Sequence, residues 1–327
     1  MVNLGKSGLN LLTMKSWFGV WLAFIAPFAF LTYSHAAEPV SVFSTGFEPE
    51  EGYDQNFTLS GQAGWVSDLP SNCQGNGLLD EPPNQWAFIG FATACDDETG
   101  LNVWRPLDFS PLGAAKPLVK FRVTIAIIDS QNGFYDCFRW SVYSTNRQRL
   151  FTLDFDNLDL SVNYLLENST TFISTGRRFP NDETMELEVE MDFTANRWHA
   201  SLSGLSLVTN QPITQANVPL HLGSIDAVWV HGVPSAPGDN YMLFDNYSVT
   251  AQAPPVKPLL LPLGFVTAQF LLRVEGENDG NYAVETSTNL SQWTAIGTNR
   301  ATGGSFLFLD SGASSHPHRF YRARLVP

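Results

Sequence analysis

Basic residues are scarce in this sequence. Its 327 residues include 18 Lys and Arg against 32 Asp and Glu, which gives a net charge of −14 at pH 7. An acidic chain is repelled by phosphate backbones and by anionic lipid head groups. We therefore expect neither nucleic acid nor an anionic membrane surface among its partners.

Cysteine is also scarce, and its spacing excludes the common zinc motifs. Only Cys73, Cys95 and Cys137 are present, without the Cys-x-x-Cys or Cys/His spacings that bind zinc. In an exported chain, Cys73 and Cys95 can form a disulfide across a loop-rich region, which leaves Cys137 unpaired.

Signatures of several enzyme classes are missing as well. The sequence has no Gly-x-Ser-x-Gly elbow, no P-loop and no dinucleotide-binding fingerprint, so none of these three chemistries is indicated. The histidines show no metal-binding spacing apart from His316 and His318. These two lie in an expected turn, and we interpret their spacing as incidental.

Only one long apolar run is present, at the N-terminus. Lys6 and Lys15 precede an apolar run over residues 17–33 that ends in small residues, the pattern of a secretory signal peptide over residues 1–36. The alternative is an uncleaved membrane anchor, but Pro27 and the adjacent cleavage site favour removal. We expect an exported protein in the periplasm, at the cell surface or outside the cell, without a membrane span in its mature form.

Helical periodicity is missing beyond this run, and strand periodicity takes its place. Residues 185–193 alternate Met, Leu, Val, Met and Phe with three Glu and one Asp, which predicts a strand with one buried and one solvated face. Many short strands separated by turns predict an all-β sandwich. The expected strands cover residues 41–48, 85–91, 119–127, 137–143, 149–155, 158–165, 185–193, 197–205, 227–231 and 241–250.

A proline-rich segment divides the chain. Residues 253–264 contain four prolines, a composition that is stiff, extended and unsuited to pairing in a sheet. We predict a linker at 253–264 between a main domain at 38–252 and a small C-terminal β domain at 265–327. Strands in the small domain are expected at residues 268–275, 281–287, 293–298, 305–310 and 319–325.

The main domain resembles a known group of secreted proteins. Gly46-Phe47-Glu48-Pro49, then Gly61-Gln62-Ala63-Gly64-Trp65 and a last strand at 243–249, resemble jelly-roll domains of the concanavalin A-like and carbohydrate-binding-module type. The resemblance covers roughly residues 38–252. It implies a jelly-roll β-sandwich that binds a polysaccharide or a component of the cell envelope.

The small domain has a resemblance of its own. Residues 282–294, Asp310 and Arg319-Phe320-Tyr321-Arg322-Ala323 resemble a C-terminal β domain that is common in exported proteins of Verrucomicrobia and related bacteria. The resemblance implies an accessory or attachment domain in a protein exported by a Gram-negative cell. It brings no established chemistry.

The first resemblance also implies a structural calcium ion. In related jelly rolls a Glu after the first-strand aromatic and an Asp of the last strand hold Ca²⁺, and Glu48 and Asp245 occupy these positions here. Asp239 or Glu50 could add a ligand. The alternative is that Glu48 and Asp245 are exposed acids at strand ends.

The acidic strand supplies an alternative function. Laminarinase-like glycoside hydrolases, which share the jelly-roll fold, carry their catalytic acids on one strand as Glu-x-Asp-x-Glu. Here the pattern is Glu186, Glu188 and Glu190, with Glu in the middle position. If Met191 pairs with Trp198, charged residues face countercharges across the hairpin, as on an ordinary solvated face. We therefore favour the solvated face over catalysis by Glu186 and Glu190.

Aromatic residues are the remaining candidates for binding. Trp86, beside Asn84 and Gln85, and Trp229, with His231 nearby, are the best placed to stack on a sugar ring. By alternation, Trp140 and Trp198 belong to the core.

Together these patterns favour an exported, non-catalytic protein that binds a glycan or acts in adhesion at the cell envelope. A glycoside hydrolase or lyase using Glu186 and Glu190 is the first alternative. A structural surface protein without a small ligand is the second.

Overall fold

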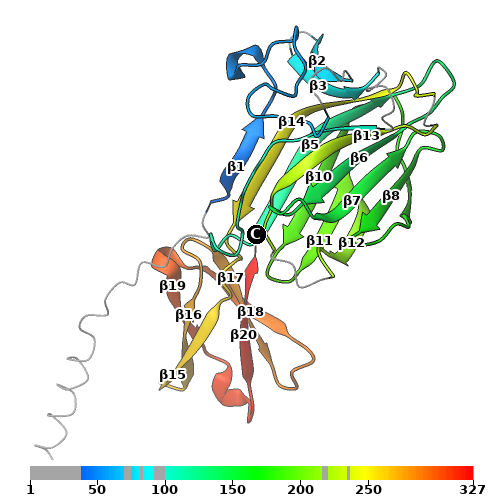
Figure 1. Ribbon diagram of the computed structural model, residues 1–327. Helices are drawn as coiled ribbons and strands as arrows, with labels where there is room; N and C mark the ends of the chain where they lie inside the picture. The colour runs from blue at the N-terminus through cyan, green and yellow to red at the C-terminus, as the bar shows by residue number, and fades with distance from the viewer. Residues whose placement is uncertain are drawn as a thin grey trace, which may run out of the picture. The chain divides into compact units, whose positions relative to one another are not determined.

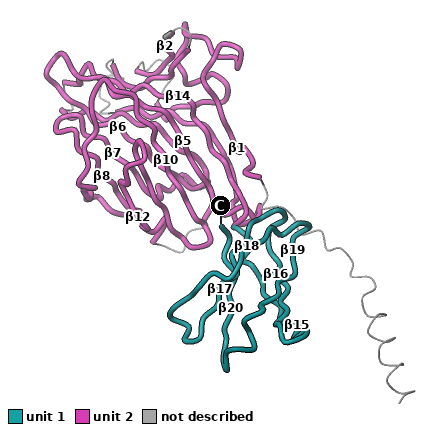
Figure 2. Tube along the Cα trace, turned by 180° about the vertical axis from the view of Figure 1, so that it is seen from behind, with its two compact units in different colours: residues 1–36, 255–327 teal, residues 37–254 magenta. Residues whose placement is uncertain are grey.

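The computed structural model describes residues 38–69, 75–81, 84–91, 100–215, 220–233 and 236–326. They fall into two compact units, a large unit (Ala37–Pro254) and a small unit (Pro255–Pro327), coloured separately in Figure 2. The predicted signal peptide and the Cys73–Cys95 disulfide lie outside the described residues. No helix among the described residues is long and apolar enough to cross a membrane.

The large unit is a jelly-roll β-sandwich of antiparallel sheets, which confirms the predicted all-β fold (Figure 1). In the eight-stranded sheet the order is β12-β11-β10-β5-β14-β3-β2, with β1 paired to β14. Its strands are β1 (Val40–Thr45), β2 (Asn76–Glu81), β3 (Asn84–Gly90), β5 (Leu118–Ile128), β10 (Met185–Asp192), β11 (Arg197–Leu202), β12 (Leu205–Pro212) and β14 (Tyr241–Gln252).

The second sheet has six strands in the order β4-β13-β6-β7-β8-β9. They are β4 (Gly100–Val103), β6 (Cys137–Tyr143), β7 (Arg149–Asp156), β8 (Ser161–Leu166), β9 (Ile173–Arg178) and β13 (Ser224–Val230).

Aromatic side chains hold the two sheets together. Trp140 of β6 packs against Phe121 of β5 and Phe244 of β14, with ring centroids 5.2 and 5.5 Å apart. Phe151 of β7 stacks on Trp198 of β11 at 4.0 Å. Trp140 and Trp198 are buried, as the alternation of their strands predicted. Such pairs add to the stability gained from apolar burial.

The predicted hairpin register is confirmed. Met191 pairs with Trp198, Glu190 with His199 and Asp192 with Arg197. The strand predicted at 197–205 is wrong in one respect, because it ends at Leu202. Ser203 and Gly204 then form a turn with φ values of 47° and 80°, and β12 runs back beside β11. Positive φ at both central residues is typical of a tight β-hairpin.

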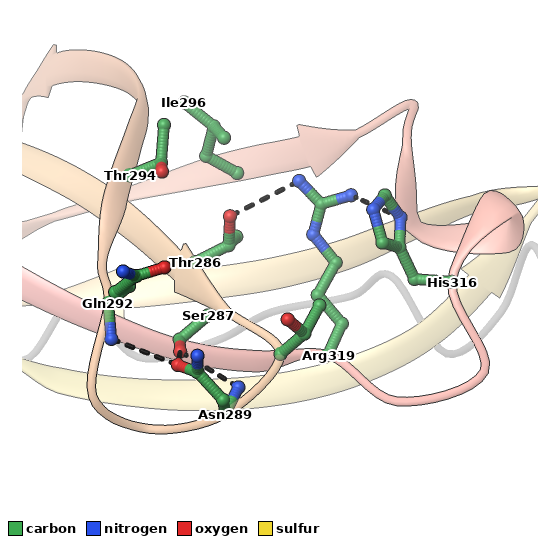
Figure 3. A pocket seen from close by; sticks show the side chains of 9 residues that line it. Thr286, Ser287, Asn289, Gln292, Thr294, Ile296, His316 and Arg319 are labelled. Atoms are coloured by element: carbon green, nitrogen blue, oxygen red, sulfur yellow. Dashed lines mark hydrogen bonds between the residues drawn. The ribbon is translucent and has the colours of Figure 1, made fainter.

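The small unit consists of two three-stranded sheets, β15-β16-β19 and β18-β17-β20. Its apolar core contains Leu272, Val274, Tyr282 and Val284. All five predicted strands are present, and Figure 3 shows a pocket lined by residues of this unit. The strands are β15 (Leu259–Val266), β16 (Gln269–Glu275), β17 (Asn281–Ser287), β18 (Thr294–Arg300), β19 (Ser305–Asp310) and β20 (Phe320–Val326).

Strand β15 begins inside the segment predicted as a linker. It is an edge strand, paired only with β16 among the described strands, and its register shifts between Pro262 and Gly264. Edge positions and bulges are where a sheet tolerates proline, because no ladder hydrogen bond is lost there. The predicted linker therefore ends too late, because proline content alone does not show where β15 begins.

Candidate functional site

The acidic face of β10 is built as the alternation predicted, but its countercharges come from the other neighbour. Lys120 Nζ of β5 lies 3.1 Å from Glu188 Oε1 and 2.7 Å from Glu190 Oε1. Arg122 Nε lies 2.5 Å from Glu188 Oε2. On β11, His199 Nδ1 instead accepts a hydrogen bond from the Asn210 backbone N–H. The predicted register holds, but the ion pairs of Glu188 and Glu190 are made with β5.

These ion pairs bear on the catalytic alternative. Partial burial raises the pKa of Glu188, but hydrogen bonds from Lys120 and Arg122 outweigh it and hold the pKa below its usual range. A glycosidase needs one carboxyl that stays protonated, and two carboxyls roughly 5–9.5 Å apart. The lowered pKa of Glu188 does not fit that acid. Glu186 accepts a hydrogen bond from Thr124 Oγ1 at 2.7 Å and Glu190 is paired with Lys120, so all three acids are engaged by side chains of β5, as on a solvated face.

The same face is hollowed. A depression of about 550 Å³ is lined by residues of β5, β10, β11 and β14, among them Lys120, Glu190, His199 and Thr250. A second depression of about 220 Å³ adjoins it, shares Glu190 and His199, and extends to Thr209 of β12. We call the two together the β10 groove. Its polar side chains are Lys120, Arg122, Glu188, Glu190, Asp192, His199, Ser201, Ser206, Thr209, Thr250 and Gln252.

The side chains of Glu48 and Asp245 both lie near Gly46. A Cβ atom placed on Gly46 would lie 3.9 Å from Asp245 Oδ1 and 4.0 Å from Glu48 Oε1. A register shift in β14 after Asp245, with Asn246 at a φ of 52°, bends the strand at this point. Asp245 is buried, so it is not the exposed acid of the alternative interpretation.

The surroundings of Asp245 are polar and acidic. Its carboxylate accepts hydrogen bonds from Asn84 Nδ2 at 2.6 Å and from the Asn246 backbone N–H at 2.6 Å. Burial raises its pKa, and the charges of Glu48 and Glu51 raise it further. Glu51, not Glu50, is thus the third acid nearby. Asp239 lies elsewhere and accepts hydrogen bonds from residues 130–132.

These carboxylates meet only part of what calcium requires. Oxygen ligands suit Ca²⁺, and Glu48 is close enough to Asp245 for its charge to act on that carboxyl. Among the described residues, however, no group of three or more His, Cys, Asp or Glu is arranged to hold a metal. Backbone carbonyls and water would have to complete the coordination.

Trp86 lies on the outer face of β3 and is partly exposed. Phe88, Phe91 and Tyr241 form an aromatic cluster on the strands beside it, with Phe91–Tyr241 centroids 5.3 Å apart and Phe91 60% exposed. The Phe88 ring lies directly over Gly77 of β2, which leaves no room for a Cβ there. The rings of this cluster therefore partly cover β2 as well as facing solvent.

Trp229 does not present its ring to a ligand, so the binding role predicted for it is wrong. Its side chain is fully buried, and its indole N–H donates to Asp136 Oδ2 at 2.8 Å. The other oxygen of Asp136 accepts the Gly232 backbone N–H. His231 is 8% exposed, with its ring centroid 4.6 Å from that of Trp229. Both residues belong to a buried structural cluster.

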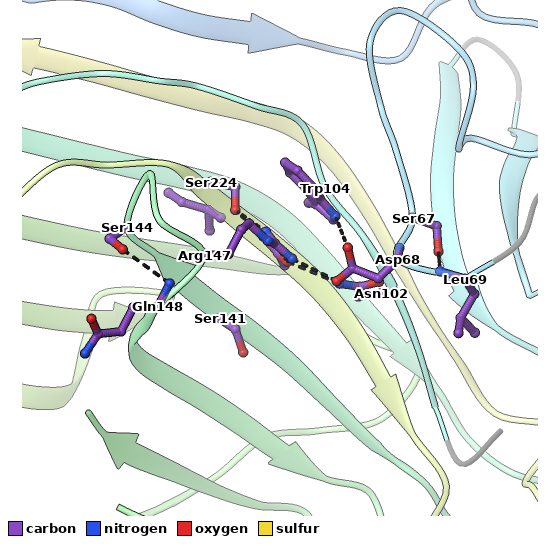
Figure 4. Close-up of polar contacts among 12 residues, drawn as sticks. Ser67, Asp68, Leu69, Asn102, Trp104, Ser141, Ser144, Arg147, Gln148 and Ser224 are labelled. Carbon is purple, nitrogen blue, oxygen red and sulfur yellow. Dashed lines mark hydrogen bonds and ion pairs between the residues drawn. The ribbon is translucent and has the colours of Figure 1, made fainter. Parts of the chain in front are cut away.

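A polar cluster around Arg147 was not predicted (Figure 4). The Arg147 guanidinium lies over the rings of Trp104 and Tyr143, at 3.9 and 4.6 Å from their centroids. Its Nη2 lies 2.8 Å from Asp68 Oδ2 and 3.2 Å from Asp226 Oδ2. Burial raises the pKa of Asp226 to about 6, despite hydrogen bonds from Ser224 and Arg147 that lower it.

Sequence spacing gives no hint of this cluster, because its members come from four separate segments. Arg147 lies in the β6–β7 turn with a φ of 59°, and Asp68 lies in a loop. The one signal is Asp226, a single acid beside the apolar run 227–230. The strand predicted from residue 227 begins too late, because β13 starts three residues earlier, at Ser224, and includes Asp226.

Comparisons with known proteins do not assign the chain to a family. No protein-family model matches it, and no curated protein does. Among solved structures, it is similar to a sialidase with a TM-score of 0.40 and 10% identity over 57% of this chain and 17% of the sialidase. The match thus spans a small part of that enzyme.

Two smaller proteins are matched over nearly their whole length. The basic winged bean lectin with Tn-antigen gives a TM-score of 0.44 and 9% identity over 66% of this chain and 100% of the lectin. The CBM2 module of the evolved Dit of Lactobacillus casei BL23 phage J-1 gives a TM-score of 0.45 and 8% identity over 66% of this chain and 97% of the module. At this level of similarity, function has to be argued from the residues of the chain itself.

Proposed function

We propose that the large unit is a carbohydrate-binding module that holds a neutral polysaccharide in the β10 groove. The observation that carries the proposal is the groove itself, a depression over five strands of one sheet whose lining combines polar and apolar side chains. Its larger part has a volume within the usual range of small-molecule sites.

The chemistry of the lining favours sugar hydroxyls. Lys120, Arg122, Glu188 and Glu190 neutralise one another in pairs, so the groove offers both donors and acceptors to a neutral ligand. Serine, threonine and glutamine side chains line the groove beside apolar residues such as Leu118 and Val208. Acidic glycans would meet the negative charge of the whole chain, which disfavours them.

The test is electrophoresis of the full chain in gels that contain neutral or acidic polysaccharides. We expect at least one neutral polysaccharide to retard the protein and Glu190→Ala to weaken this binding about tenfold, the effect of losing one charged hydrogen bond. Glu186→Ala is the matched control, because Glu186 lies on the same face but bonds to Thr124 outside the groove lining. Retardation by no polysaccharide would favour the structural surface protein.

The products released from the polysaccharide distinguish an enzyme from a binding module. A glycoside hydrolase would release reducing ends from the bound polysaccharide, and a lyase would release unsaturated sugars. If the wild type releases such products and both Glu186→Gln and Glu190→Gln abolish the release, the protein is an enzyme and not a binding module.

We further propose that Glu48 and Asp245 bind a structural Ca²⁺ ion. Repulsion of the Asp245 carboxylate by Glu48 and Glu51, which acts together with burial to raise the pKa of Asp245, supports this proposal. A divalent cation would relieve that repulsion. Export of the chain and an accessory or attachment role for the small unit complete the proposed function.

A further inference from the structure

The small unit contains a polar pocket of about 300 Å³ that the function proposed for the large unit does not use (Figure 3). It lies where β17 ends, and is closed by the β17–β18 loop and by residues between β19 and β20. Its lining residues are Thr286, Ser287, Thr288, Asn289, Gln292, Thr294, Ile296, His316 and Arg319.

One wall of the pocket is held in place by its own side chains. Ser287 Oγ accepts hydrogen bonds from the backbone N–H groups of Asn289 and Leu290, at 3.2 and 2.8 Å. Asn289 Oδ1 accepts two more, from Ser291 and Gln292. The loop therefore has a fixed shape before any ligand arrives, which lowers the entropic cost of binding.

Arg319 forms the opposite wall, and its charge is already compensated. Its Nε lies 3.0 Å from Asp310 Oδ2, and the two side chains are only 13% and 6% exposed. Its Nη2 donates to Thr286 Oγ1 at 3.2 Å, and its Nη1 lies 3.1 Å from His316 Nδ1. His316 Nδ1 also lies 3.1 Å from the Gly312 carbonyl oxygen. The charge that Arg319 brings to the pocket is thus compensated by Asp310.

Several polar groups of the lining remain available. Within the part of the chain that the structure describes, the side chains of Thr288, Gln292 and Thr294 have no hydrogen-bond partner. Two hydroxyls and one amide offer donors and acceptors at separate points of one small pocket. A neutral ligand with several hydroxyls on one ring satisfies such a set, whereas an anion would need uncompensated positive charge.

We propose that this pocket binds a single neutral saccharide unit, such as a chain end or a branch. Its volume is at the lower end of the range of small-molecule sites and suits one ring better than an extended chain. The β10 groove and this pocket would then be two separate sugar sites on one chain.

Titration of the full chain with methyl glycosides of glucose, galactose, mannose and N-acetylglucosamine, followed by ligand-observed NMR, tests the proposal. We expect saturable binding of at least one glycoside and a roughly tenfold loss of affinity in Thr294→Val, which removes one hydroxyl. Thr298→Val is the matched control, because Thr298 is exposed on the same strand outside the lining. If Thr294→Val unfolds the unit, Gln292→Ala tests the same pocket from the loop.

Three results would overturn the proposal. They are binding of no glycoside, an equal effect of Thr294→Val and Thr298→Val, and binding of only glucuronate or inorganic sulfate, which would make the pocket an anion site. Glu190→Ala should leave glycoside binding here unchanged. A failure of this pocket is therefore distinguishable from a failure of the groove.

Discussion

At the scale of single residues, Asp226 makes the stability of the large unit depend on pH. It is fully buried, and its pKa is about 6 in the folded chain against an ordinary 3.8. Between these two values the folded state binds more protons than the unfolded state, so stability falls as pH rises through this window. The full effect is about 3 kcal/mol, lost by neutral pH.

Replacing Asp226 by Asn should remove this dependence. We expect the melting temperature of the wild type to fall relative to that of Asp226→Asn as pH rises from about 4 to about 6, because only the wild type must ionise a buried carboxyl. Comparing the slopes of melting temperature against pH removes the contributions of all other titratable groups, which the two proteins share. Parallel slopes would show that Asp226 is ionised without cost beside Arg147.

Trp198 tests the assignment of the two faces of β11. Its side chain is fully buried and stacks on Phe151 at 4.0 Å. Trp198→Ala should cost about 3–5 kcal/mol in the free energy of unfolding, measured by urea denaturation. Its neighbour Arg197 is exposed, so Arg197→Ala should change that energy by less than about 0.5 kcal/mol. Similar effects of both changes would contradict the alternation.

At the scale of elements, calcium should stabilise β14 around Asp245. If Glu48 and Asp245 bind Ca²⁺, added calcium raises the melting temperature of the large unit, and a chelator reverses this. Asp245→Asn should abolish the response, since it removes a ligand that approaches Glu48. A melting temperature that is independent of calcium in the wild type would refute the site.

The β10–β11 hairpin shows what the sequence could predict and where prediction ended. A period of two fixes both faces of each strand, and matching the faces fixes the register of neighbours that follow one another in the chain. Lys120 lies more than 60 residues before Glu188. Nothing local indicates that β5 pairs there. The ion pairs and the groove depend on that long-range pairing, so neither could be predicted.

Besides β15, four strands were not predicted from the sequence, and they share a different cause. β2, β4, β9 and β12 are short, or carry polar and glycine residues that hide the alternation. β9 is almost wholly exposed, so burial imposes no pattern on it. The binding role predicted for Trp229 was wrong for another reason. A tryptophan near a histidine in the sequence resembles a sugar-stacking site, but the sequence does not show that the ring is buried.

At the scale of the whole molecule, two units with separate cores should unfold separately. The small unit depends on a few buried residues, including Val274, Tyr282 and Val284, whereas the large unit has an extensive aromatic core. We expect two transitions in calorimetry, with Val284→Ala lowering only that of the small unit. A single transition that moves as a whole would mean that the two units unfold cooperatively.

The central claim is that the β10 groove binds a neutral polysaccharide, and amide hydrogen exchange of the full chain with and without the best-binding polysaccharide tests it most directly. The account predicts slower exchange in β5, β10 and β11 around Lys120, Glu190 and His199, absent in Glu190→Ala and retained in Glu186→Ala. Unchanged exchange in these strands, or protection confined to the aromatic cluster around Phe91 and Tyr241, would contradict it.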